Sequence, residues 1–236
     1  MKIRKIIFLL LLVSMVLTVP GPQDLRYMAG AVKVPLTLVV DAGHGGPDGG
    51  AEADDGTEEA KLNLAIAKTL QTEAERKGMR VIMTRTTAEG LYGDENLEKK
   101  WRKLEDMKCR RNIIEASEAD AVISIHMNSF PADPAVRGAQ VFYPKSGNAE
   151  VLRRSEELAK AVQESLTEGL ADGTGRQHMG KGSVYLLENP AVPTVLVECG
   201  FLSNAEDLAR MKNEKTQKKI AACILEGLLA WDGNIN

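Results

Sequence analysis

Short apolar runs alternate with amphipathic segments along most of this 236-residue chain, and this order restricts the possible folds more than any other feature. The runs are rich in β-branched residues and bounded by turn residues, as buried strands are; they lie at 35–40, 80–84, 120–126, 138–143, 183–187 and 193–198. Apolar residues recur at helical spacing between them, at 58–77, 97–117, 149–170 and 215–231. This alternation predicts a single-domain α/β fold, with a mostly parallel, twisted sheet of about six strands flanked by helices on both faces.

The N-terminal residues are of a different kind. Lys2, Arg4 and Lys5 precede a stretch of fourteen uncharged residues. A basic end followed by a short apolar stretch is typical of an export signal, and the stretch is short for a membrane span. A buried core helix is the alternative, although the stretch has no polar face. We therefore predict a signal peptide or N-terminal membrane anchor over residues 1–31 and a catalytic domain over 32–236, in an exported, extracytoplasmic protein that meets the membrane only through this segment.

The charge and cysteine content argue against a nucleic-acid-binding surface and against a cysteine-based zinc site. The formal net charge of −3 offers no basic surface for nucleic acid. The mixed-sign run at 98–111 is expected to form a solvated helix face. Cys109, Cys199 and Cys223 are too few and too scattered for a disulfide framework or a cysteine-based zinc site. Any metal must therefore be held by other side chains.

Polar side chains stand where the predicted strands end. His44 follows the first strand in the glycine-rich stretch "DAGHGGPDGG", His126 closes the third strand, and Glu198 closes the last. Ligands of an open α/β sheet gather beyond the carboxyl ends of its strands, so we expect these three residues to face one crevice. A glutamate at the start of the next helix joins them, and Glu58 and Glu59 fit equally well by spacing.

These residue types are those of a zinc hydrolase. Two imidazoles and one carboxylate bind Zn²⁺ and leave enough positive charge to acidify a water molecule. A further carboxylate that is not a ligand can take the proton of that water and pass it to a leaving amine, and Glu198 suits this role. The structural alternative is a pair of hydrogen-bonded histidines, but a carboxylate that ends a buried apolar strand is costly unless it is paired or close to a metal.

A thiol nucleophile is the rival hypothesis. Cys199 follows Glu198 directly and could be paired with a histidine. Successive side chains of a strand point to opposite faces, however, so the thiol is expected on the other side of the sheet from the carboxylate.

Six motifs carry a family resemblance. In order, "DAGHGGPDGGA", "EAKLNLAIAKTL", "VIMTRTT", "ISIHMNS", "RGAQVFY" and "VPTVLVECGFLSN" resemble the motifs of the zinc-dependent N-acetylmuramoyl-L-alanine amidases of the type 3 amidase family, over residues 35 to 231. The resemblance implies that His44, Glu59 and His126 bind zinc and that Glu198 is catalytic; the register E-x-x-L-N-L selects Glu59. The departures, "DAGHGG" for the usual "DPGHGG" and a cysteine after the catalytic glutamate, affect no ligand.

The resemblance also implies a substrate and a location. Members of the family cleave the amide between N-acetylmuramic acid and the L-alanine of the stem peptide in peptidoglycan. The chain has no cell-wall-binding repeat and no long insert between His126 and Glu198. The extra helix around 95–117, together with the short N-terminal signal or anchor, resembles the spore-cortex members, which are implicated in muramic-δ-lactam formation. That role implies the cell wall or the forespore intermembrane space. Asn128 and Arg137, close to strand ends, are candidate substrate contacts.

Three alternatives stay open at this point. A zinc peptidase acting within the stem peptide would use the same metal ligands. A non-catalytic cell-wall-binding module would bind peptidoglycan without releasing product. The excursion at 86–117 also leaves room for an activating protein partner. His178, in a flexible glycine-rich stretch, is expected on the surface or at the rim of the cleft.

Overall fold

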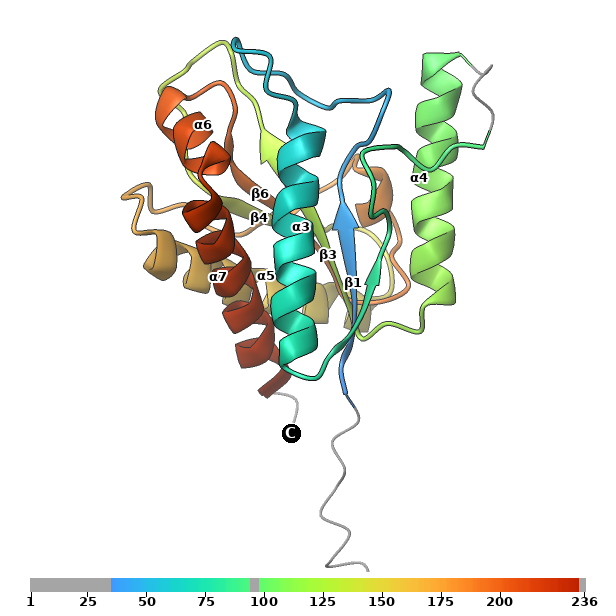
Figure 1. The fold of residues 1–236 in the computed structure, drawn as a ribbon. Helices are drawn as coiled ribbons and strands as arrows, with labels where there is room; N and C mark the ends of the chain where they lie inside the picture. Colours follow the sequence, from blue (N-terminus) through green and yellow to red (C-terminus); the bar gives the residue numbers. More distant parts are fainter. Residues whose placement is uncertain (1–34, 94–97, 234–236) are drawn as a thin grey trace, which may run out of the picture. The chain divides into compact units, whose positions relative to one another are not determined.

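Six strands form one sheet in the order β2-β1-β3-β6-β4-β5 (Figure 1). The computed structural model describes residues 35–93 and 98–233, so the export segment predicted over 1–31 lies outside the described residues. Every neighbouring pair of strands is parallel except β4 and β6, which confirms the mostly parallel sheet. The strands are β1 (Thr37–Ala42), β2 (Arg80–Met83), β3 (Ala121–Asn128), β4 (Gln140–Pro144), β5 (Met179–Lys181) and β6 (Thr194–Phe201).

Helices cover both faces of this sheet, as predicted. Along β1, Leu38 and Val40 pack into the large core shared with α3, α5 and α7, whereas Val39 faces the opposite way and packs with Ile114 of α4. Figure 1 shows α3 running beside α7 over the first face. The helices are α3 (Glu59–Arg76), α4 (Lys99–Ala116), α5 (Ala149–Leu170), α6 (Ala205–Lys212) and α7 (Glu214–Gly233). Within the described residues, no helix is apolar and long enough to cross a bilayer.

One predicted strand is wrong. The run at 183–187 contains a short 3-10 helix, Tyr185–Leu187, and the edge strand β5 lies a few residues earlier. The run is apolar because Leu186 and Leu187 are both buried, but they contact two separate clusters of the core. Apolar periodicity over so short a run does not distinguish a buried strand from a buried helical turn.

The chain after the last strand also differs from expectation. β6 continues past Glu198 to Phe201, and α6 follows without having been predicted. Asn204 caps this helix, since its side-chain oxygen accepts a 3.0 Å hydrogen bond from the backbone N–H of Asp207. An asparagine cap followed by acidic residues is a sequence signal for a helix start, and it was available in "SNAED".

Candidate metal centre

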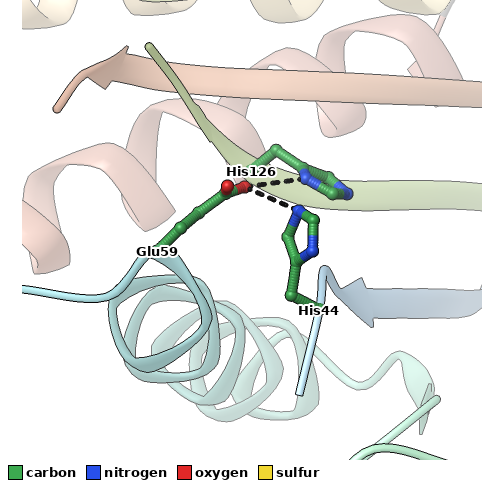
Figure 2. Close-up of side chains that lie close together, drawn as sticks. All are labelled: His44, Glu59 and His126. Carbon is green, nitrogen blue, oxygen red and sulfur yellow. Dashed lines mark hydrogen bonds and ion pairs between the residues drawn. The ribbon is translucent and has the colours of Figure 1, made fainter. Parts of the chain in front are cut away.

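Three of the predicted site residues meet at the carboxyl end of the sheet (Figure 2). His44 follows β1, Glu59 is the first residue of α3, and His126 lies in β3. The Glu59 Oε1 atom is 3.3 Å from His44 Nε2 and 2.9 Å from His126 Nδ1. One donor atom from each residue lies within 4.8 Å of the others. Residues from three separate elements therefore direct their donor atoms at a common centre.

The loop between β1 and α3 brings these side chains together through its glycines. A Cβ atom at Gly43 would lie 2.3 Å from His126 Cε1, and one at Gly50 would lie 2.5 Å from Glu59 Oε2. Gly50 also has a φ of +73°, in the left-handed region that glycine tolerates best. The side chains of the site thus occupy the space that any larger residue would need at these two positions.

His44 itself has a left-handed backbone, with φ at 60°. For a residue with a side chain this conformation costs about 1–3 kcal/mol and persists only where the surroundings hold it. The guanidinium of Arg110 donates a 2.6 Å hydrogen bond to the His44 carbonyl. This contact helps to hold the backbone that directs the imidazole at the site.

Glu59 is held as a carboxylate. Although burial favours the neutral acid, hydrogen bonds with His126 and His44 lower the pKa of Glu59 far below its usual range. The backbone N–H of Met127 and the side-chain amide of Asn63 donate to Oε1 at 3.1 and 3.2 Å. Its neighbour Glu58 instead forms an ion pair with Lys61 at the surface. The structure therefore places Glu59, and not Glu58, at the centre.

His44 is set between two carboxylates. Burial disfavours its charged form, but hydrogen bonds with Asp48 and Glu59 outweigh this effect and raise the pKa of His44 to about 9. Without a metal, these neighbours therefore favour the imidazolium form of His44, with a hydrogen on both ring nitrogens. A metal ion would take the place of one of these hydrogens, because only the neutral imidazole coordinates.

The donor set fits a zinc ion. Ligand atoms about 2.0–2.2 Å from a tetrahedral Zn²⁺ lie ~3.3 Å apart. The two histidine nitrogens lie 2.9 and 3.3 Å from Glu59 Oε1, close to that spacing. Three protein ligands leave a fourth position for water, which is the arrangement of catalytic rather than structural zinc sites.

Glu198 lies beside this centre without joining it. It pairs in register with His126 on the adjacent strand, so both side chains project from the same face of the sheet. Burial raises the pKa of Glu198, and its Oε2 atom is buried with no hydrogen-bond partner among the described residues. Lys181 of β5 places its Nζ 3.8 Å from the other oxygen. A buried carboxylate with a raised pKa next to a metal position has the properties of a proton acceptor.

A buried ion network supports the loop, and the sequence did not reveal it. Arg110 is fully buried, and it pairs with Asp41 of β1 and Asp106 of α4, each at 2.6 Å. Although burial favours the neutral acid, Arg110 and hydrogen bonds from Ser124 and Thr84 lower the pKa of Asp41 to about 2. The expectation that the charged run at 98–111 is a solvated face is therefore wrong for Arg110 and Asp106. The one sequence feature that pointed to a buried ion pair is Asp41, a carboxylate at the end of a buried strand.

A second arginine holds the same loop by its backbone. Arg85 follows β2 and is buried. It donates hydrogen bonds of 2.8 and 2.9 Å to the carbonyls of Ala42 and Gly43, and a third of 2.8 Å to the carbonyl of Ala60 in α3. This side chain therefore ties the end of β1 to the start of α3, which are the two elements that carry His44 and Glu59.

The two candidate substrate contacts lie outside the metal centre. Asn128 ends β3, and its side-chain oxygen accepts a hydrogen bond from the N–H of Ser129 at 2.8 Å. Arg137 is partly exposed and forms an ion pair with Glu206 of α6 at 3.2 Å. Their contact with substrate stays a prediction. His178 is half-buried and packs against Tyr143, with ring centroids 5.9 Å apart, and it is not part of the group that could hold a metal.

Cys199 points away from the site. It is buried in the large core among residues of the opposite face of β6. Burial and the neighbouring Glu198 carboxylate raise the pKa of this thiol well above its usual range. Since the thiolate is the nucleophile, this environment argues against the thiol mechanism.

Comparisons with known proteins agree with this geometry. The sequence model of a family described as N-acetylmuramoyl-L-alanine amidase matches residues 38–230. The germination-specific N-acetylmuramoyl-L-alanine amidase of Bacillus subtilis is 34% identical over 194 residues, which cover 82% of this chain and 78% of that protein. The CwlD amidase of Clostridioides difficile, solved in complex with the GerS lipoprotein, is 38% identical with a TM-score of 0.79, covering 84% of this chain and 98% of that one. An N-acetylmuramoyl-L-alanine amidase of Clostridium difficile 630 is 27% identical with a TM-score of 0.71, covering 84% and 97%.

Proposed function

The chain belongs to the type 3 family of N-acetylmuramoyl-L-alanine amidases, and we propose that it hydrolyses the amide between N-acetylmuramic acid and the L-alanine of the stem peptide with zinc held by His44, Glu59 and His126. The observation that carries this proposal is the convergence of these three donors on one centre directly beside Glu198. The family indicates the reaction, and the geometry supports the roles proposed for these residues.

The roles follow from the chemistry of each group. His44, Glu59 and His126 would hold a zinc ion, which when bound would supply a Lewis acid for the scissile carbonyl and for water. Glu198 accepts the proton of the attacking water on its unpartnered oxygen, as a buried carboxylate with a raised pKa is suited to do. The same carboxyl group then donates this proton to the departing amine of L-alanine. Lys181, 3.8 Å away, favours the charged form of Glu198 before each turnover.

The similarity to a germination-specific amidase favours a role in the spore cortex. Cleaving the stem peptide from muramic acid is the step that frees the lactyl carboxyl group for muramic-δ-lactam formation. The substrate lies outside the cytoplasm, which agrees with the export segment predicted over 1–31. The structural relative solved with a lipoprotein supports the further expectation that a protein partner assists this chain.

Digestion of purified peptidoglycan tests the proposal. The zinc-loaded protein should release stem peptides that begin with a free L-alanine amine, as identified by mass spectrometry, and a chelator should abolish their release. Cleavage within the stem peptide would instead assign a zinc peptidase. Binding to peptidoglycan with no product, with and without a candidate partner protein, would assign a non-catalytic wall-binding module.

A further inference from the structure

We propose that Asp48 is a positioning residue that fixes the tautomer and the orientation of His44, so that Nε2 of this imidazole faces the metal position. The inference rests on the proposed function, because it concerns the same metal centre. It assigns a role to a residue of the glycine-rich loop that is not itself in the group of metal donors.

The two ring nitrogens of His44 have separate partners. Nδ1 lies 3.1 Å from Asp48 Oδ2, and Nε2 lies 3.3 Å from Glu59 Oε1. An ionised carboxylate can only accept a hydrogen bond, so contact with Asp48 places the hydrogen of the neutral imidazole on Nδ1. The lone pair is then on Nε2, which is the nitrogen on the side of Glu59 and His126. A carboxylate behind a coordinating imidazole also raises the basicity of that ligand.

The surroundings of Asp48 keep its side chain charged and in place. Lys103 of α4 brings its Nζ to 3.2 Å from Oδ2, and the backbone N–H of Gly50 donates to Oδ1 at 3.2 Å. These cationic and polar neighbours favour a carboxylate over a neutral acid. Both oxygens of Asp48 therefore have partners that restrict its rotation.

The backbone of Asp48 is fixed independently of its side chain. Gly45 and Asp48 exchange two backbone hydrogen bonds, of 2.9 and 3.0 Å, across the turn that follows His44. Replacing the side chain should therefore leave the loop in its present conformation. This separation allows the effect on the metal site to be measured apart from any effect on the fold.

The experiment compares Asp48→Ala and Asp48→Asn with the unaltered protein and with Asp54→Ala, a matched control for an exposed aspartate of the same loop. Zinc affinity is measured by competition with a chromophoric chelator, and the geometry of the site is followed by the visible spectrum of the Co²⁺-loaded protein. Thermal unfolding of each metal-free protein reports on the fold.

The expected result is a weakening of zinc binding by about 10- to 100-fold in Asp48→Ala, the range found when the outer partner of a coordinating histidine is removed. Asp48→Asn should keep part of the affinity, since its amide oxygen still accepts from Nδ1 without the charge. Asp54→Ala should bind zinc as the unaltered protein does. The Co²⁺ spectrum should change in Asp48→Ala alone. The metal-free Asp48 variants should still unfold in one cooperative transition, with a lower midpoint because the contacts of Asp48 with His44 and Lys103 are lost.

Two outcomes would overturn the inference. One is zinc affinity within about twofold of the unaltered protein in Asp48→Ala, or in Asp48→Asn should the alanine variant not fold. The other is an equal loss in Asp54→Ala. If the unaltered protein itself binds no zinc, the proposed function fails; if it binds zinc and cleaves peptidoglycan while the Asp48 variants match it, only the role of Asp48 is wrong.

Discussion

Replacing Glu198 by glutamine separates the chemistry of the site from its stability. The substitution keeps the size of the side chain and removes the only ionisable oxygen that the proposed mechanism uses for proton transfer. Glu59 cannot take over this role, because its pKa is held far below the usual range by His126 and His44. Loss of a general base costs about 10²- to 10⁴-fold in rate, which corresponds to about 2.7–5.4 kcal/mol of transition-state stabilisation at 1.36 kcal/mol per tenfold.

Glu198→Gln should lower turnover, but it should raise the stability of the fold or leave it unchanged. Burial raises the pKa of Glu198 above its value in the unfolded chain. A carboxyl group shifted in this direction makes the folded state less stable as the pH rises above the unfolded value, because ionisation is then easier in the unfolded chain. Glutamine is neutral at every pH and removes this cost. We therefore expect the melting temperature of Glu198→Gln at neutral pH to equal or exceed that of the unaltered protein.

The assay measures release of stem peptide from purified peptidoglycan, with zinc content and thermal unfolding recorded on the same samples. Glu198→Gln should still bind about one zinc ion per chain. Glu226→Gln, which alters an exposed glutamate of α7, is the matched control and should leave turnover unchanged. Turnover of Glu198→Gln within tenfold of the control, with zinc bound, would show that another group accepts the proton.

Three further predictions concern the surroundings of the site. Because zinc coordinates only the neutral imidazole, and its neighbours raise the pKa of His44 to about 9, zinc affinity should rise about tenfold per pH unit up to about pH 9 and level off above it in chelator competition; a flat profile would contradict this. Arg110→Met leaves the buried carboxylates of Asp41 and Asp106 unpaired and should lower the free energy of unfolding by about 3–5 kcal/mol in denaturant titrations; a loss under about 1 kcal/mol would refute the role of the pair. Cys199→Ala should cost about 0.5–3 kcal/mol of stability as a core truncation and keep its turnover, whereas inactivity of a folded variant would revive the thiol hypothesis.

The sequence predicted that His44, His126 and a glutamate would meet, because each lies close to the end of a strand or the start of a helix. In a parallel sheet such positions converge at one edge, so His44 and His126 could be grouped without knowing the exact strand boundaries. The sequence spacing did not distinguish Glu58 from Glu59 as the third member of the site, because both residues lie at the start of the helix. The resemblance made that choice, and the structure places only Glu59 beside the histidines.

The support of the site could not be predicted from the sequence. Arg110 and Asp41 are 69 residues apart, and a charged run within a helix has no local feature that marks one of its members as buried. The 3-10 helix at 185–187 and α6 were missed for different reasons. The first is apolar but too short for its periodicity to be decisive. The second is a short helix whose cap, Asn204, is the last residue of the final family motif.

The arrangement of these contacts bears on the order of folding and metal binding. The left-handed backbone of His44 and the carbonyls of Ala42 and Gly43 are held by the side chains of Arg110 and Arg85, and none of these contacts requires a metal. In small zinc domains, by contrast, the energy of metal binding is the energy of folding. Here the large core and the two arginines hold the loop through contacts among the protein's own groups. We therefore expect zinc binding to contribute little to the ordering of this loop.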